Sequence, residues 1–366
     1  MTKSKYLSYF FIITIFSMQG LACLINYVFD YSNQWTDYSQ FAKLAIEEKI
    51  ISVPPNYNER EFQNQIIKNL KKIPETIIIG SSRGMYLGKE ILKQESLYNH
   101  CVSGGNLFDY FAILGLYKKY WNKIPNNIVI EASPWIFSDV SPEERWKENN
   151  CYRIASYDYY ALLIGRKNPY LIKYLPYKSP LFSFTYMFTN LSKTFQNSLK
   201  FGIKKGLQVS SYIVHESNNE SEQAELPDGT IRYNKKREKY SEDRRNKVIS
   251  TSVGPVLYQD CNKMKEISQS KYYAFNKLID NLIEQKVKVT IFLAPFSKSQ
   301  CDWIYNKNSN PIFIDIENKL IELSQNSNIK IVGSYNSNNF NFTDDDFIDF
   351  MHGDKNLIKK IWNYKK

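Results

Sequence analysis

The chain has 366 residues, of which 43% are hydrophobic and 15% aromatic, and this composition argues against a disordered or low-complexity protein. Its 48 Lys and Arg against 37 Asp and Glu give a formal net charge of +11 at pH 7. That charge suits an anionic envelope surface or an acidic polymer as well as nucleic acid, but no nucleic-acid-binding motif accompanies it, so we expect no nucleic-acid partner.

The first apolar segment predicts a membrane anchor. Residues 6–29 carry no charge, and 24 residues in a helix at about 1.5 Å each would cross a hydrocarbon layer of about 30 Å. Lys3 and Lys5 precede the segment and Asp30 follows it, which predicts a single-pass protein with a cytoplasmic amino terminus and an extracytoplasmic remainder, in the periplasm or at the cell surface. The sequence ending in Cys23 is faintly similar to a lipoprotein cleavage box, but the apolar run continues beyond it and favours an uncleaved anchor.

The chain after the anchor divides into a stem and a large domain. We assign 1–30 to the tail and anchor, 31–74 to a stem that leads into a helix at 59–71, and 75–366 to the large domain. Apolar strands at 76–80 and 127–132 flank a short extended segment at 98–104, and helical spacing occupies 85–94 and 107–121. Alternating strands and helices predict an α/β fold with a central parallel sheet.

This alternation stops at about 135 and resumes after 262. Between these positions the chain is rich in Tyr, Phe and Pro and then highly charged, which favours a large, mainly helical insertion. A basic run at 235–245 is typical of a solvated face, with an anion-binding patch as the alternative. The later elements are expected as a helix at 265–285, a strand at 288–294, a helix at 311–325, a strand at 329–332 and a terminal helix at 355–364.

A candidate catalytic group combines residues from both ends of the large domain. Ser82 follows the first strand, where open α/β sheets place their chemistry. A serine hydroxyl becomes a nucleophile only when an imidazole can take its proton and a carboxylate orients that imidazole. His352 has Asp349 three residues before it, on the same face of a helical turn. Ser82 as a simple helix cap and His352 as a structural histidine are the alternatives.

These motifs resemble a known family. Gly80-Ser81-Ser82, the segment from Asn99 to Gly104, and Asp349-x-x-His352 are similar to blocks one, two and five of the SGNH (GDSL-like) hydrolases, over about 76–134 and 265–366. The resemblance implies a flavodoxin-like three-layer sandwich in which Ser82 is the nucleophile, His352 the general base and Asp349 its orienter. It also implies an oxyanion hole containing the Ser82 and Gly104 amides. Gly-Ser-Ser and the anchor are more similar to the envelope branch, such as the DltD-like and alginate-acetylation proteins, which handle acyl groups on surface polymers.

The sequence departs from the family pattern in two blocks. Ser81 replaces the usual aspartate of block one, and block three has Trp135 about where a side-chain amide should complete the oxyanion hole. We expect Asn106 to substitute for that amide, because it comes just after the glycine pair. Arg83 and Trp135 are candidate substrate-binding residues.

The sequence therefore predicts a membrane-anchored serine esterase or O-acyltransferase that acts on a cell-envelope polysaccharide or related glycan. Its partners would be an acyl donor or acyl-bearing glycan, with other polysaccharide-assembly proteins as candidates, and the chemistry needs no cofactor or metal. The alternative is an inactive scaffold or glycan-binding protein; a phosphate-binding Rossmann domain is weaker, because Gly-x-Gly-x-x-Gly is absent. Five cysteines without a Cys-x-x-Cys pair make a zinc site unexpected, whereas one or two disulfides of open connectivity could form in an exported domain.

Overall fold

A computed structural model describes residues 3–29, 36–53, 57–165, 182–201, 216–217, 219, 222–233, 247, 250, 263–306, 312–327 and 329–364. The basic run at 235–245 and Cys261 lie outside these residues. The other four cysteines, Cys23, Cys101, Cys151 and Cys301, have free thiols.

The body is built on a five-stranded sheet in which every pair of neighbours is parallel, in the order β3-β2-β4-β7-β8. This confirms the predicted α/β class and the central parallel sheet. The strands are apolar on both sides because helices cover both faces of a parallel sheet. The strands are β2 (Thr76–Ile79), β3 (Leu97–Asn99), β4 (Asn127–Glu131), β7 (Lys288–Leu293) and β8 (Lys330–Gly333).

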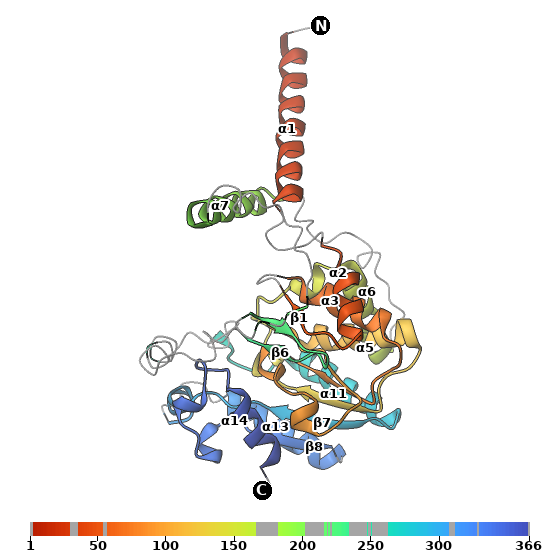
Figure 1. Cartoon of the computed structure of the whole chain (residues 1–366), viewed down its shortest axis with the longest axis vertical. Helices are drawn as coiled ribbons and strands as arrows, with labels where there is room; N and C mark the ends of the chain where they lie inside the picture. Colours follow the sequence, from red (N-terminus) through yellow and green to blue (C-terminus); the bar gives the residue numbers. More distant parts are fainter. Residues whose placement is uncertain are drawn as a thin grey trace.

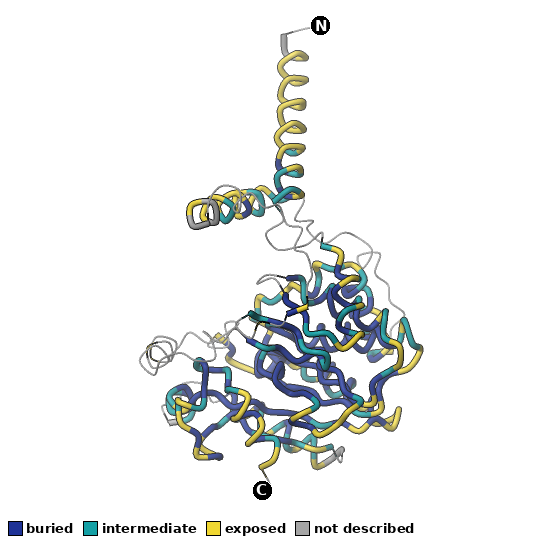
Figure 2. The backbone as a smooth tube through the Cα atoms, in the orientation of Figure 1, coloured by how far each residue is buried: buried dark blue, intermediate teal, exposed yellow. Residues whose placement is uncertain are grey.

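Successive residues of the strands pack into two different hydrophobic clusters. Ile77 and Ile79 belong to the cluster under helices α5 (Leu107–Trp121), α6 (Asn150–Leu163), α11 (Gln269–Glu284) and α13 (Ile312–Ser327). Ile78 faces the other side, toward α4 (Lys89–Leu92) and α14 (Lys355–Asn363). Figure 2 shows the sheet as the buried centre of the body. Helices therefore cover both faces.

The helix predicted at 85–94 is shorter than expected. The chain forms the 3₁₀ turn η1 (Ser82–Gly84) and then α4, with no helix between them. The reason is the buried Asn99, whose Nδ2 donates to the carbonyls of Gly84 at 2.8 Å and Leu87 at 2.7 Å. Those carbonyls are thus taken by a side chain. The other predicted helices of the large domain form with shifts of a few residues, and α5 has the predicted bounds.

The segment expected as a stem packs on the body. Helix α2 (Tyr38–Ile46), strand β1 (Ile51–Ser52) and helix α3 (Glu59–Asn69) share a core cluster with Tyr98 from the sheet. Strand β1 also pairs with a hairpin of β5 (Ala224–Glu225) and β6 (Ile231–Arg232) from the insertion. The described insertion thus contains a small antiparallel sheet as well as helices. Its other elements are η2 (Pro134–Phe137), η3 (Arg145–Lys147), α6 and α7 (Phe184–Phe201); near the carboxyl terminus lie α12 (Lys298–Cys301), η7 (Asp302–Asn306), η8 (Ser337–Phe340) and η9 (Asp344–Asp346).

Helix α1 (Lys3–Val28) stands apart from the body (Figure 1). It is long and apolar enough to span a membrane. Most of its apolar side chains are exposed in the described structure: Leu7, Phe10 and Phe16 are 71%, 70% and 73% exposed. This fits a single-pass anchor.

A buried histidine lies between α3 and α5. Nδ1 of His100 is 2.6 Å from Gln63 Oε1, and Nε2 is 2.8 Å from the Tyr117 hydroxyl. Because Oε1 only accepts, Nδ1 carries the hydrogen of a neutral ring and Nε2 accepts from Tyr117. Burial lowers the pKa of His100 to about 3. His100 is therefore a structural group.

This depressed pKa predicts a pH dependence of stability. The unfolded imidazole takes up a proton below about pH 6.5 while the folded one does not, so His100 costs stability as the pH falls from 6.5 toward 3. His100→Asn should remove up to about 1.4 kcal/mol per pH unit from the slope of unfolding free energy between pH 6 and 4. Denaturant titrations of the full chain in detergent measure it. The unfolding free energies of the two proteins should change in parallel with pH above pH 7. Parallel changes below pH 6 would contradict the assignment.

Candidate active site

The nucleophile candidate sits on a tight turn after β2. Ser81 is the residue that caps η1, since its Oγ accepts the Arg83 N–H at 3.2 Å. Ser82 Oγ lies instead 2.8 Å from His352 Nε2. The alternative of Ser82 as a simple helix cap is therefore wrong.

His352 and Asp349 complete a hydrogen-bonded chain. Nδ1 of the ring is 2.9 Å and 2.8 Å from the two oxygens of Asp349, and these two side chains are 12% and 22% exposed. Because the carboxylate accepts at Nδ1, the neutral ring leaves Nε2 without a hydrogen and able to accept from the Ser82 O–H. The structure thus brings the three predicted residues together, although Ser82 and His352 are 270 positions apart.

The environment of Asp349 favours its charged form. Burial alone would raise the pKa of this carboxyl, but the His352 ring and the backbone N–H groups of Met351 and His352 outweigh burial and lower the pKa to about 2. Those N–H groups donate to Oδ1 at 3.0 and 2.8 Å. The carboxylate is thus ionised at neutral pH and fixes the orientation of the ring.

A glycine turn lies directly against the serine turn. Val102 N–H donates to the Gly80 carbonyl at 3.1 Å, and a Cβ on Gly105 would come within 2.2 Å of that carbonyl oxygen. Gly104 has φ +66°, a left-handed conformation that favours glycine. Only a residue without a side chain fits at Gly105, and this close approach sets the glycine turn against Gly80 and Ser81.

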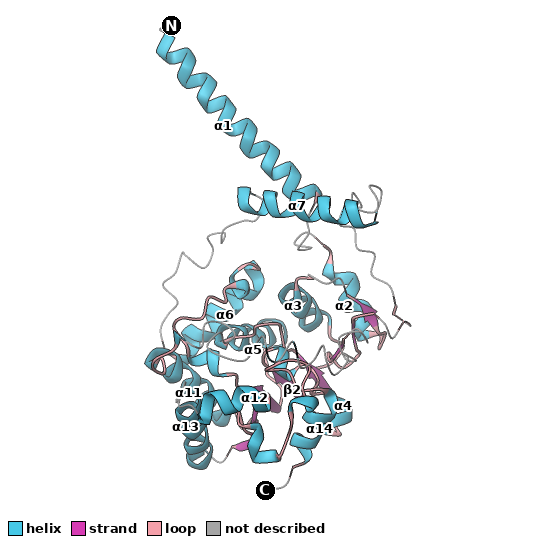
Figure 3. Ribbon diagram, turned by 90° about the vertical axis from the view of Figure 1, so that its left-hand side faces the viewer, coloured by secondary structure: helices cyan, strands magenta, loops and turns pink. Residues whose placement is uncertain are grey.

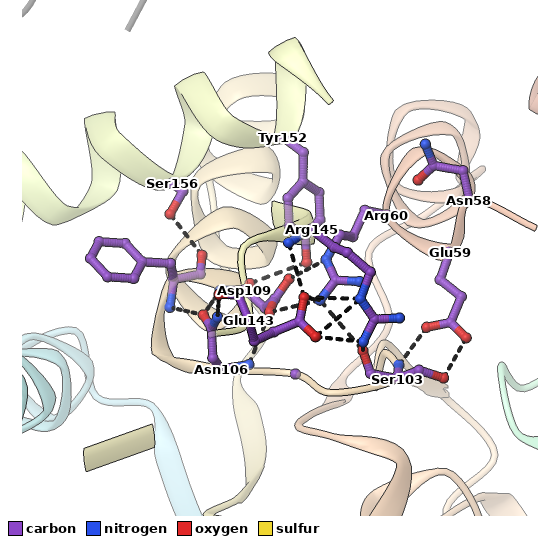
Figure 4. A network of polar contacts seen from close by, with 12 residues as sticks. Asn58, Glu59, Arg60, Ser103, Asn106, Asp109, Glu143, Arg145, Tyr152 and Ser156 are labelled. Carbon is purple, nitrogen blue, oxygen red and sulfur yellow. Dashed lines mark hydrogen bonds and ion pairs between the residues drawn. The ribbon is translucent and has the colours of Figure 1, made fainter. Parts of the chain in front are cut away.

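A buried ionic network fixes the residue before this turn (Figure 4). Arg60 of α3 forms two hydrogen bonds to Asp109, at 2.9 and 3.2 Å, and both side chains are almost fully buried. The carbonyl of Ser103 accepts from Arg60 at 3.4 Å and from Arg145 at 2.8 Å. Its hydroxyl donates to Glu59 at 2.6 Å. Two segments outside the sheet therefore position the glycine turn.

Asn106 does not have the free side-chain amide that we predicted. Its Oδ1 caps α5 by accepting the N–H groups of Phe108 at 2.8 Å and Asp109 at 3.3 Å. Its Nδ2 donates to the Glu143 carbonyl at 3.1 Å. Both ends of the amide thus take part in bonds within the protein, and Asn106 is a helix cap, while its role as an oxyanion donor stays a prediction.

Arg83 was predicted as a substrate-binding residue, but the structure buries it. Arg83 is 3% exposed, and its Nε donates to the Met351 carbonyl at 3.2 Å while Nη2 donates to Ala294. Its guanidinium carbon lies 4.1 Å from the centre of the Phe296 ring. The cation therefore joins segments of the protein, which corrects its assignment to substrate binding.

The indole of Trp135 supports the glycine turn, because it donates to the Gly105 carbonyl at 2.9 Å. Trp135 is 1% exposed, yet it lines a small cavity of about 140 Å³ together with Asn106 and Glu143. Its N–H is thus not available to a substrate, and only the ring contributes to the cavity.

Glu131 is a site residue that the sequence analysis missed. It is fully buried at the end of β4, and its carboxylate accepts the Ser81 N–H at 2.9 Å and the Ser133 hydroxyl at 2.5 Å. The Glu131 carboxylate therefore fixes the serine turn through the Ser81 backbone N–H. An acidic residue at the end of an otherwise apolar buried strand was the available signal.

Within the described ranges, no three His, Cys, Asp or Glu side chains gather closely enough to hold a metal ion. Comparison of the chain with protein-family models and with curated proteins returns no match.

Replacing Arg83 should destabilise the protein. Arg83→Met keeps an apolar side chain but leaves the Met351 and Ala294 carbonyls without this donor, at a cost of about 2–4 kcal/mol. Lys359→Met is the control, because Lys359 is 49% exposed and its ion pair with Glu90 is worth about 1 kcal/mol or less. Thermal unfolding compares the two variants, and equally small effects would contradict the role of Arg83.

Gly105→Ala should force the two turns apart. The added Cβ would overlap the Gly80 carbonyl oxygen, and we expect a loss of about 3 kcal/mol in stability. Gly20→Ala is the control, since nothing lies within 4 Å of its added Cβ. Denaturant titration of both variants tests the contact, and a Gly105→Ala variant as stable as the control would refute it.

Proposed function

We propose that this protein is a membrane-anchored serine acyl-transfer enzyme. The observation that carries the proposal is the hydrogen-bonded chain from Ser82 through His352 to Asp349. The strand order supports it, because numbering the sheet strands along the chain gives the order 2-1-3-4-5 of flavodoxin-like folds. In such folds ligands bind beyond the carboxyl ends of the strands, where Ser82 and the glycine turn follow β2 and β3.

The chemistry follows from the hydrogen bonds. Ser82 Oγ attacks the carbonyl carbon of an ester as its proton passes to His352 Nε2. The tetrahedral intermediate then releases its alcohol, which takes the proton from His352 and leaves the acyl group on Ser82. Water or a sugar hydroxyl gives its proton to His352 and takes the acyl group, and His352 returns the proton to Ser82 Oγ as the acyl–serine bond breaks. Asp349 stabilises the imidazolium in both steps.

The oxyanion would be stabilised by backbone donors. Ser82 is the first residue of η1, so its N–H has no acceptor within that turn, and the family resemblance gives the second position to the Gly104 amide. Trp135 stands where the family has a side-chain amide donor, and Nδ2 of Asn106 donates to the Glu143 carbonyl. Because one such donor is worth about 10²–10³ in rate, we expect slow turnover unless the substrate supplies a donor.

We infer that the acyl group belongs to a cell-envelope polysaccharide or related glycan and that the catalytic domain is extracytoplasmic. The charges around the α1 segment and the net charge of +11 support this site of action on an anionic surface. The second candidate function is an inactive scaffold or glycan-binding protein of an envelope assembly. The engagement of both ends of the Asn106 amide favours that alternative.

Ester hydrolysis tests the proposal. With the full chain in detergent and p-nitrophenyl acetate as substrate, Ser82→Ala should abolish turnover above background, and Asp349→Asn should lower kcat by about 10³–10⁴ through loss of the correct tautomer. Ser81→Ala is the comparison, because it removes the neighbouring hydroxyl and the cap of η1 but keeps Ser82, and it should retain measurable turnover. Full activity in Ser82→Ala would refute the assignment, and an inactive wild-type protein would favour the scaffold.

A further inference from the structure

Helix α7 carries an apolar stripe that nothing in the described protein covers. Its apolar residues recur at intervals of four, three, four and four residues, which places them on one side of the helix. Phe188, Phe195 and Leu199 are 64%, 65% and 73% exposed. The full stripe is Phe184, Phe188, Leu191, Phe195 and Leu199.

A second side of α7 and the two residues before the helix bind the end of α1. The buried Asn190 donates to Asn26 Oδ1 at 3.2 Å, and Asn26 Nδ2 donates to the Ser183 carbonyl at 2.9 Å. Gln19 Nε2 donates to the Phe182 carbonyl at 3.0 Å. Polar side chains in a membrane-spanning helix are expensive without partners. These bonds satisfy polar groups of α1 and fix α7 to it.

The contact defines the depth of α7 along the anchor. It runs from Gln19 to Asn26, which is a rise of about 10 Å at the carboxyl-terminal end of α1. The residues from Tyr6 to Gln19 add about 20 Å on the other side. Figures 1 and 3 both show α7 at this end of α1 and running transverse to it. With α1 spanning the bilayer, this position and direction would put α7 at the membrane–water interface.

We propose that α7 is a second membrane-binding element, which lies in the bilayer interface of the leaflet nearest the globular body. Its stripe is inserted among the acyl chains. The occupant is lipid because α7 packs against α1, a helix of membrane-spanning length whose apolar side chains are also exposed. The exposed residues on the remaining side are polar, as the headgroup region requires: Thr185, Thr189, Ser192 and Gln196.

Membrane attachment through α7 would be a function of the insertion that the proposed chemistry does not require. Helix α7 lies between α6 and the hairpin strand β5 in the chain, so the insertion is attached to the membrane at a point separate from the backbone of α1. This attachment would limit the rotation of the body about α1.

Site-directed spin labelling of the full chain in nanodiscs of phosphatidylethanolamine and phosphatidylglycerol tests the proposal. Labels at Phe188→Cys and Phe195→Cys, in a background whose native cysteines are replaced, are compared with labels at Thr189→Cys and Gln196→Cys. The ratio of collision rates with oxygen and with a water-soluble nickel chelate should be roughly tenfold higher on the apolar side, as expected for insertion by about 5–10 Å.

Equal ratios on the two sides would overturn the proposal, and exclusion of both reagents from the apolar side would show that a protein covers it. Photo-crosslinking keeps the test independent of the cysteine background. A benzophenone amino acid at position 195 of the otherwise native chain should yield lipid adducts, whereas adducts to a second copy or another protein would contradict a lipid occupant.

Discussion

The site depends on a buried cation next to the nucleophile. Arg83 follows Ser82 directly, and its guanidinium donates to the carbonyl of Met351, the residue before His352, and to that of Ala294 after β7. Burying this charge without hydrogen-bond partners would cost much free energy. The Phe296 ring adds a favourable cation–π contact of about 0.5–2 kcal/mol. The serine turn and the histidine loop thus share a support, so that the Ser82–His352 hydrogen bond joins two elements already held together.

The oxyanion side of the site has its own supports. The glycine turn rests on the serine turn through Gly105 and is fixed by Arg60, Glu59 and Arg145 at Ser103. Helix α3, which supplies Arg60 and Glu59, precedes the sheet in the chain. Helix α3 is therefore part of the structure that positions the candidate site, and we expect the glycine turn to lose its geometry without it.

The sequence predicts well those strands and helices that are set by local residue patterns. The strands follow apolar β-branched runs, and α5 follows its helical spacing. Asp349 and His352 meet as predicted, but they do so in a bend closed by the Ile348 N–H on the His352 carbonyl and not on the expected helical turn. The meeting of Ser82 with His352 required the topological rule that parallel strands present their ends at one edge. Roles that depend on partners distant in the sequence could not be predicted. Arg60 pairs with Asp109, 49 residues away, and Asn99 of β3 bonds the carbonyls of Gly84 and Leu87 in the segment where a longer helix was expected. The two-residue strands β5 and β6 carry too little pattern to be read.

The central claim is that Ser82 is activated by His352 and Asp349. The most direct measurement is the reaction of the full-length protein with a fluorophosphonate, followed by identification of the modified residue by peptide mass spectrometry. The account predicts one adduct per chain, on Ser82, whose formation is slowed strongly when His352 is replaced by Ala. A protein that stays unmodified, or is modified at another serine at a rate that does not depend on His352, would contradict it.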